Sequence, residues 1–336
     1  MLNKNRIFFL LFLLFFLAGC ATDNISNTND TASYHGQELL FVKDAQVYAA
    51  DTDGLNSINV SAHDGNNFFP AWLKEKEVIL FVSEKDGFYG IWQKNLLNND
   101  KNLLWGSKLA PKFISLSPDH NWLIYAEEQT CFLFNINTKN AQEITDACDH
   151  MAWSDQSRSF IYQEGETIYF REFNIKQELS VAKELYKGLV FGTIFLDQKN
   201  LIFETKDIEP EATKYDLYKF SLDTKVLTPV TNLDFSGTDE VNLQLSPNST
   251  QLIYNRVDSA TKIPSAWLVN ISQTPALAKL VLNNAQEIIW QPDSAGFYYV
   301  INELDEESNN IPNIFRASKD GLNKEKIQDH AEQIAI

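Results

Sequence analysis

Short apolar segments separated by polar turns recur along the chain from about residue 36 to its end. One full unit contains Phe69–Trp72, the apolar run Val78–Ser83, and Phe88–Trp92 after an Asp-Gly turn. Runs of this length, rich in aromatic and β-branched residues and bounded by turn residues, predict β-strands. The same frame of a first and a second segment returns five more times: Ile114–Asp119 with Trp122–Tyr125, Met151–Ser154 with Ser159–Tyr162, Thr193–Phe195 with Leu201–Phe203, Leu243–Pro247 with Leu252–Tyr254, and Ile288–Asp293 with Phe297–Tyr299.

The spacing of these units is typical of propeller blades. Each unit divides into four short strands, with turn residues where hairpins require them. Repeats of about 40–50 residues with four strands each predict a β-propeller. The steps between units are 44, 37, 42, 50 and 45 residues, measured between Trp72, Leu116, Trp153, Phe195, Leu245 and Trp290.

The two ends of the chain together supply the strands of one blade. Gln37 to Val60 supplies a second, third and fourth strand with no first strand before them. Gln333–Ile336 ends 46 residues beyond Trp290 and repeats the pattern of Glu287–Trp290. We therefore predict an all-β fold, a seven-bladed β-propeller of four-stranded blades, closed by pairing of its N- and C-terminal strands so that no sheet edge stays open.

The repeat resembles the TolB-type propeller repeat. That motif runs roughly Trp-Ser-Pro-Asp-Gly, an apolar strand, Ser-x-x-Asp-Gly and Ile-Tyr, and the unit from Trp72 to Trp92 matches it best. The resemblance covers nearly all of residues 36 to 336 and implies a propeller fold. Some propellers of this type are fused to serine hydrolase domains, but only the propeller part is carried over here. TolB itself has an additional N-terminal domain, for which residues 21 to 33 leave no space.

The first residues resemble a bacterial lipoprotein signal. Lys4 and Arg6 precede an apolar run from Ile7 to Leu17, which is followed by Ala-Gly and Cys20. The resemblance implies cleavage before Cys20 and a lipid on its thiol. The alternative is a short membrane anchor, but eleven residues at about 1.5 Å each cover only half of a ~30 Å hydrocarbon layer.

This signal divides the chain into three parts. Residues 1–19 form the signal peptide, residues 20–33 the lipidated cysteine and a polar tether, and residues 34–336 the propeller. Ala21 occupies the position where an aspartate would, by the enterobacterial sorting rule, retain the protein at the inner membrane. We expect attachment to the outer membrane on its periplasmic side, with cell-surface exposure as an alternative. The lipid is the only membrane contact we expect.

Composition and charge narrow the choice of partners. Aromatic residues make up 12% of the chain, which suits half-buried sheet surfaces. The formal charge is -17, and removal of Lys4 and Arg6 with the signal leaves 26 bases against 45 acids, or -19. Such a surface repels phosphate backbones, so nucleic acid is not an expected partner.

Two cysteines remain besides Cys20. Cys131 and Cys148 lie on either side of a predicted hairpin, 17 residues apart, which makes them a disulfide candidate in an oxidising periplasm. The alternative is a pair of buried free thiols.

Loops between second and third strands share a face with the loops that enter each first strand. The loops between second and third strands are long in the last three units, at 206–216, 256–265 and 302–313. Together these three loops carry 9 acidic and 4 basic residues. Loops on a rigid scaffold often carry recognition, so this face is the expected docking surface for an envelope protein or peptide. Ordinary solvated insertions are the alternative. The candidate binding residues are Asp207, Glu209, Glu211, Arg256, Glu303, Asp305, Glu306 and Glu307.

Three histidines with neighbouring aspartates precede first strands on the same face. Imidazole and carboxylate groups are common ligands of divalent metals. The candidate metal ligands are His63, His150, Asp149 and His330, with polar turn residues as the simpler interpretation. No other cofactor is expected.

No Gly-x-Ser-x-Gly, His-Glu-x-x-His, Gly-x-Gly-x-x-Gly or phosphate-loop motif occurs in the sequence. The leading hypothesis is a non-enzymatic, lipid-anchored periplasmic scaffold that binds a protein or peptide. The alternatives are a metal-dependent glycan-active enzyme, by analogy with propeller-type polysaccharide lyases, and a binder of small ligands.

Overall fold

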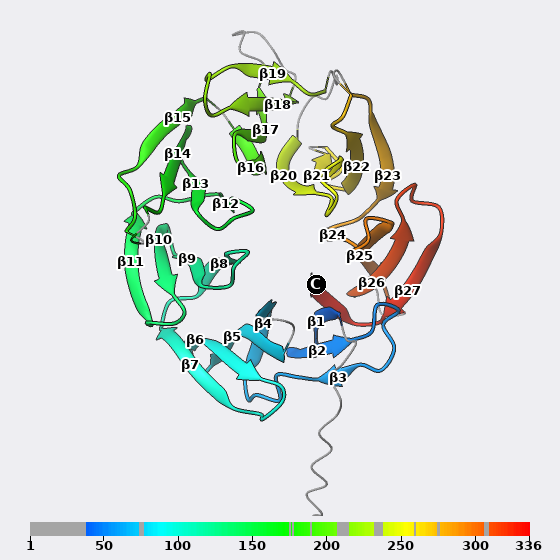
Figure 1. The fold of residues 1–336 in the computed structure, drawn as a ribbon. Coiled ribbons are helices and arrows are strands. Elements are labelled where there is room, and N and C mark those ends of the chain that lie inside the picture. The colour runs from blue at the N-terminus through cyan, green and yellow to red at the C-terminus, as the bar shows by residue number, and fades with distance from the viewer. Residues whose placement is uncertain are drawn as a thin grey trace, which may run out of the picture. The chain divides into compact units, whose positions relative to one another are not determined.

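The computed structural model contains seven four-stranded antiparallel sheets arranged as the blades of a ring (Figure 1). It describes residues 38–73, 77–174, 176, 178–188, 190–206, 215–231, 238–258, 260–273, 276–305 and 309–336. Among these residues no helix is long and apolar enough to cross a membrane. The prediction of a seven-bladed β-propeller is therefore confirmed.

Each blade runs from an inner to an outer strand, and only blade 1 takes its strands from both ends of the chain. Blade 1 consists of β28 (Ala331–Ala335), β1 (Leu39–Lys43), β2 (Gln46–Ala50) and β3 (Ile58–Asn59). Blade 2 consists of β4 (Asn66–Leu73), β5 (Val78–Lys85), β6 (Phe88–Asn95) and β7 (Lys101–Ser107); blade 3 of β8 (Pro111–Leu116), β9 (Trp122–Glu127), β10 (Thr130–Asn135) and β11 (Asn140–Thr145); blade 4 of β12 (Met151–Trp153), β13 (Ser159–Glu164), β14 (Thr167–Glu172) and β15 (Lys183–Lys187). Blade 5 consists of β16 (Val190–Asp197), β17 (Asn200–Lys206), β18 (Tyr215–Ser221) and β19 (Leu227–Pro229); blade 6 of β20 (Thr238–Leu245), β21 (Gln251–Asp258), β22 (Pro264–Asn270) and β23 (Ala278–Asn283); blade 7 of β24 (Ile288–Trp290), β25 (Gly296–Leu304), β26 (Asn310–Ser318) and β27 (Lys324–Gln328).

The ring closes where the last strand pairs with the first. β28 is antiparallel to β1, with Leu40 opposite Ala335 and Lys43 opposite Ala331. This pairing supplies the inner strand that the N-terminal segment lacks, as the sequence predicts. β28 thereby becomes the inner strand of blade 1 and covers the edge of β1 that would otherwise be open.

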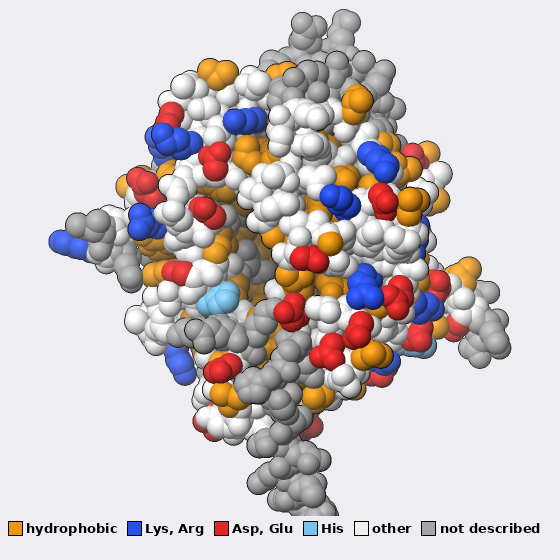
Figure 2. All heavy atoms as spheres, turned by 45° about the vertical axis from the view of Figure 1, so that its right-hand side comes forward, with side chains coloured by type: hydrophobic (Ala, Val, Ile, Leu, Met, Phe, Trp, Pro, Cys, Tyr) orange, Lys and Arg blue, Asp and Glu red, His pale blue; other side chains and the backbone are white. Residues whose placement is uncertain are grey.

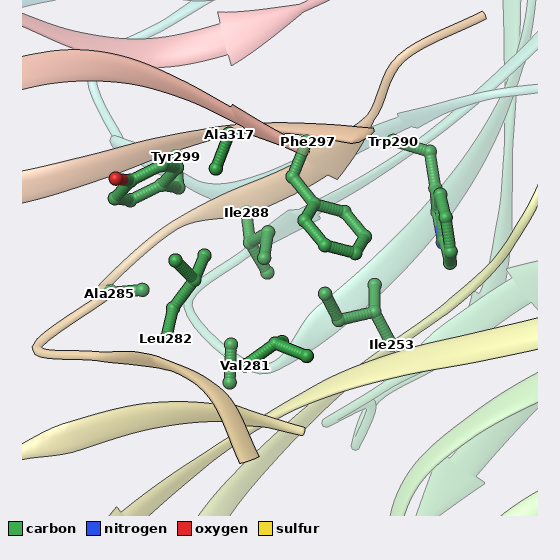
Figure 3. Close-up of a cluster of buried hydrophobic side chains, with 10 residues drawn as sticks. Ile253, Val281, Leu282, Ala285, Ile288, Trp290, Phe297, Tyr299 and Ala317 are labelled. Carbon is green, nitrogen blue, oxygen red and sulfur yellow. The ribbon is translucent and has the colours of Figure 1, made fainter. Parts of the chain in front are cut away.

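The core lies between adjacent blades. The second strands carry runs of buried residues, such as Leu39–Val42 in β1 and Leu123–Ala126 in β9, because neighbouring blades cover both of their faces. Figure 3 shows one such cluster, in which Ile253 and Leu282 of blade 6 pack together with Ile288 and Phe297 of blade 7. An uninterrupted apolar run in a short strand therefore marks a second strand in this fold.

The tryptophans of the repeat bind neighbouring blades together. The indole N–H of Trp72 donates to the backbone carbonyl of Glu38 at 3.1 Å, which lies just before β1 in the preceding blade. Trp153 donates in the same way to Ser115 at 3.3 Å, and Trp290 to Gln244 at 3.2 Å. A buried indole needs an acceptor, so each of these side chains both fills the inter-blade core and fixes the position of two blades.

The turn after the first strand makes a second recurring contact. In blade 3 the backbone N–H of Asp119 donates to the hydroxyl of Ser157 in blade 4 at 2.7 Å. In blade 6 the backbone N–H of Asn248 donates likewise to Ser294 in blade 7 at 3.3 Å. The polar turn residues of the repeat therefore also join adjacent blades.

Cys131 in β10 and Cys148 in the connection after β11 form a disulfide with a Cα–Cα distance of 5.8 Å. Both residues are buried in the core between blades 3 and 4. The register between β10 and β11 shifts between Cys131 and Phe132, and Cys131 lies opposite Thr145. The bond fastens the start of the connection to blade 4 onto the third strand of blade 3.

Candidate binding site in the central channel

The structure describes only some of the predicted loop residues. Cys20, Asp207, Glu209, Glu211, Glu306 and Glu307 lie outside the described residues. The segment 302–313 is less a loop than expected, because β25 and β26 stay paired as far as Leu304 and Asn310. Similarly, β21 and β22 stay paired as far as Val257 and Pro264. In these two segments, extended strands replace much of the predicted loop.

Arg256 is not a surface binding residue, contrary to the sequence prediction. Its side chain is only 4% exposed and pairs with the fully buried carboxylate of Glu204 in blade 5 at 2.9 Å. Its guanidinium also lies 5.6 Å from the ring centre of Tyr254. Alternation along β21 turns Arg256 toward blade 5, so it holds two blades together instead of facing a partner.

Glu303 and Asp305 fix the β25–β26 hairpin. The Glu303 carboxylate accepts from the Asn313 amide at 2.8 Å and lies 2.7 Å from the Lys326 ammonium. Asp305 accepts from the backbone N–H of Asn309 at 2.7 Å, which closes the turn. These acids have local partners, and Figure 2 shows charges of both signs interspersed on the face that it presents.

The candidate metal ligands do not converge. Within the described part of the chain, no three His, Cys, Asp or Glu side chains lie close enough together to hold an ion. The His63 ring packs on Trp92, with 4.6 Å between ring centres, while Asp149 lies 3.6 Å from the Lys112 ammonium. The backbone N–H of His330 donates to Asn313 at 2.9 Å. These residues lie in connections that lead into different blades, with His63 before β4, Asp149 and His150 before β12, and His330 before β28.

The inner strands of blades 1, 2 and 3, together with Glu287 of blade 7, instead line a cavity of about 310 Å³. This volume is at the lower end of the roughly 300–1,000 Å³ that is usual for ligand sites. Its wall is mainly apolar, and its polar groups are the side chains of Glu287 and Gln333. The lining residues are Phe69, Pro70 and Ala71 of β4, Ile114 and Leu116 of β8, Gln333 and Ile334 of β28, and Glu287 just before β24.

Two irregular strands shape this cavity. The register of β4 shifts between Phe68 and Ala71, and Phe69 has a φ of 51°. Gln333 in β28 has a φ of 53°. Its side-chain oxygen accepts from the backbone N–H of Phe69 at 2.6 Å, so the two irregular strands are joined across the seam between blades 1 and 2. A bulky residue at positive φ is uncommon, and backbone outliers of this kind often occur at functional sites.

Glu287 is the acidic group of the cavity. One carboxylate oxygen accepts from the backbone N–H of Ile334 at 2.9 Å. Burial raises the pKa of Glu287 to about 7, although N–H groups of residues 333 and 334 favour the ionised form and the nearby Glu332 opposes it. The cavity therefore presents a carboxyl group that gains or loses its proton near neutral pH.

This arrangement suits a ligand with a positive charge on an apolar stem. The apolar wall favours burial of a hydrocarbon chain, and a cation next to Glu287 would stabilise its ionised form. In the sequence, Glu287 stands out only as the start of a pattern shared with Gln333–Ile336, which gives no sign of a binding role. The feature of the sequence that could have pointed to Glu287 is a carboxylate at the start of an inner strand, where apolar residues predominate.

Comparisons with known proteins support the fold. No family model matches the chain, and no curated protein matches it. TolB from Acinetobacter baumannii is similar in structure, with a TM-score of 0.56, 14% identity, and coverage of 89% of this chain and 66% of that one. The chain thus spans just under two thirds of the length of that TolB.

Enzymes share the same architecture. An oligogalacturonate lyase in complex with manganese matches with a TM-score of 0.61, 10% identity, and coverage of 88% of this chain and 86% of that one. A protein described as a 6-phosphogluconolactonase from Bacteroides fragilis matches with a TM-score of 0.59, 12% identity, and coverage of 90% and 98%. At such identities the likeness shows a shared propeller fold, which serves both TolB-like proteins and enzymes.

Proposed function

We propose that this chain is a non-enzymatic scaffold of the cell envelope that binds a protein or peptide. Its lipid anchor would be Cys20, and its placement the periplasmic side of the outer membrane. The central channel receives a basic side chain of the partner, a lysine or arginine, beside Glu287. The observation that carries this proposal is the apolar cavity with one carboxylate among its lining residues.

The chemistry of the cavity favours a basic side chain over a neutral one. Lysine and arginine combine a hydrocarbon stem with a cationic end, so the stem can lie along Ile114 and Leu116 while the charge reaches Glu287. An ion pair in this partly buried place also gives specificity, because an uncharged or acidic side chain would leave the carboxylate without compensation or repel it. The hairpin of β25 and β26 is a second surface that the partner can contact.

Photo-crosslinking in intact cells tests this proposal. A diazirine amino acid replaces Leu116 in the channel or Leu304, which is 68% exposed at the tip of β25. The matched control position is Val181, which is 88% exposed at the outer side of the ring. We expect a discrete adduct from position 116, attached beside a lysine or arginine of the partner, and less of it when Glu287→Gln is added. Equal adducts from positions 116 and 181 would argue against a channel site.

A second candidate is a metal-dependent enzyme that acts on glycans. The observation in its favour is again Glu287, because a carboxyl group with a pKa near the working pH can serve as a general acid or base. The test is incubation of the purified chain with oligogalacturonate and added divalent metal, with product length as the readout. Turnover that is lost in Glu287→Gln would favour the enzyme, whereas no turnover together with the channel adduct favours the scaffold.

A further inference from the structure

A second site lies away from the channel, where basic residues of blade 2 meet the connection between β3 and β4. Lys94 in β6 and Lys101 in β7 are opposite one another in the sheet. His63 lies over the same sheet, with its ring on Trp92 and its Nδ1 2.5 Å from the Lys101 ammonium. That ammonium also lies 5.5 Å from the ring centre of Trp92. We call His63, Lys94 and Lys101 the basic cluster.

The basic cluster has no carboxylate of its own. The Lys94 side chain is buried, with the residue 7% exposed, and its ammonium donates to the backbone carbonyl of Ser61 at 3.3 Å. Within the described residues no Asp or Glu forms a salt bridge with Lys94 or Lys101. The nearest acid of the connection, Asp64, pairs at 3.4 Å with Lys85.

The cations of this cluster act on one another. Burial and the Lys101 charge lower the pKa of Lys94. Burial lowers the pKa of His63 as well, with Lys101, Lys85 and Lys94 adding to the effect and Asp64 opposing it. The protein as a whole is acidic, with a formal charge of -17. The basic cluster is therefore a locally positive region on an otherwise acidic protein. Buried charges normally have a counter-charge, and an anion from outside the chain can supply it.

The geometry also provides donors. His63 Nδ1 is the acceptor for Lys101, so the neutral ring carries its proton on Nε2 and can donate it. Each ammonium has three N–H donors, and the backbone contact of Lys94 with Ser61 uses only one of them. His63 is half-buried and Lys101 exposed, so an anion can reach them from solvent.

We propose that the basic cluster is a binding site for a phosphate-type oxyanion. The oxyanion lies between the Lys94 and Lys101 ammonium groups and accepts a hydrogen bond from His63 Nε2. Its charge replaces the missing carboxylate, and its several oxygens match the several donors. The ligand is either free phosphate or the phosphate of a lipid headgroup. This site is independent of the channel, which selects the opposite charge.

Titration of the purified full-length chain with sodium phosphate tests this site, against sodium chloride at equal ionic strength. The first readout is the melting temperature, and the second is the NMR titration of the His63 ring. We expect phosphate to raise the melting temperature and to move the His63 pKa upward, since an anion favours the imidazolium. Equal effects of phosphate and chloride on both readouts would overturn the proposal.

Variants make the assignment specific. Lys101→Met removes an exposed ammonium and should weaken phosphate binding at least tenfold. The matched control is Lys199→Met in blade 5, an exposed lysine that pairs with Asp223 at 3.4 Å and should bind phosphate as the wild type does. Equal binding by both variants would contradict the proposal. His63→Gln, which keeps a donor but removes the titrating ring, should retain part of the affinity.

The source of the phosphate is settled by a second ligand. Dihexanoyl phosphatidylglycerol, used below its micelle concentration, offers a headgroup phosphodiester instead of a free phosphate. Tighter binding of this lipid than of inorganic phosphate, again lost in Lys101→Met, assigns the site to a headgroup. Tighter binding of inorganic phosphate assigns it to the free ion, and binding of neither overturns the proposal.

Discussion

Replacement of Glu287 by glutamine should stabilise the propeller at alkaline pH but hardly at acidic pH. The folded chain holds the pKa of Glu287 at about 7, above its ordinary value of 4.5, because burial penalises the charged form. The proton therefore binds more tightly to the folded than to the unfolded chain. The stability that this gives is fully present below about pH 4.5 and is lost as the pH rises through 7.

The size of this effect follows from the shift. The difference of 7 minus 4.5 is 2.5 pH units, and each unit corresponds to about 1.4 kcal/mol, so the full loss is about 3 kcal/mol. The glutamine side chain is neutral, so it avoids the cost of burying a charge, and its oxygen can still accept a hydrogen bond from the Ile334 N–H. Relative to wild type, Glu287→Gln should gain about 2 to 3 kcal/mol in unfolding free energy between pH 5 and pH 8.

Urea unfolding, followed by tryptophan fluorescence at pH 5 and pH 8, measures this gain. The matched control is Glu143→Gln, which replaces an exposed carboxylate on the outer strand β11 and gives the background effect of a lost surface charge. A Glu287→Gln variant with the same difference from wild type at both pH values would refute the reasoning. It would mean that Glu287 is as well solvated in the channel as in the unfolded chain.

Three further sets of substitutions test the contacts between and within blades, each by urea unfolding. Trp153→Phe should lower stability by about 1 to 2 kcal/mol, because it removes the indole hydrogen bond to the preceding blade; no loss would show that this bond contributes little. The double variant Cys131→Ser/Cys148→Ser should lose roughly 3 kcal/mol, the value for a closed loop of about this length, and reducing agent should then have no effect on it. Arg256→Met should cost about 3 to 5 kcal/mol, because it removes the cation that compensates the buried Glu204 carboxylate, and adding Glu204→Leu should restore most of the loss; a mild effect of the single change would contradict the buried pair.

The ring architecture could be predicted from the sequence because the repeat is a packing requirement. Each blade needs an apolar second strand that is buried on both faces, and these runs recur at the blade period. Closure of the ring was also predictable. The N-terminal unit lacks a first strand and the C-terminal segment is a single first strand, so pairing of the two completes one blade. The pairing of Leu40 with Ala335 confirms it.

The binding residues were harder to predict, because they depend on contacts between blades. Arg256 follows a buried run and precedes turn residues, so the sequence alone allows either a loop or the end of a strand. Its burial is decided by Glu204, which lies 52 residues earlier and in another blade. A charge pattern read along one segment cannot reveal such a partner.

The channel cavity was missed for a similar reason. It forms because the register of β4 shifts near Phe69 and Gln333 adopts a positive φ. Neither phenylalanine nor glutamine is a residue type that predicts a positive φ. Glu287 becomes special only when these irregular strands surround it. The sequence could show a carboxylate on an inner strand, but its environment comes from four different blades.

The most direct test of the channel site is calorimetric titration of the purified full-length chain with n-butylammonium at pH 8. The neutral analogue 1-butanol serves as the control ligand, and Glu287→Gln as the control protein. We predict that wild type binds the ammonium ion and not the alcohol, and that Glu287→Gln binds neither. Binding of the ammonium ion with equal affinity by wild type and Glu287→Gln, or no binding by wild type, would contradict the account.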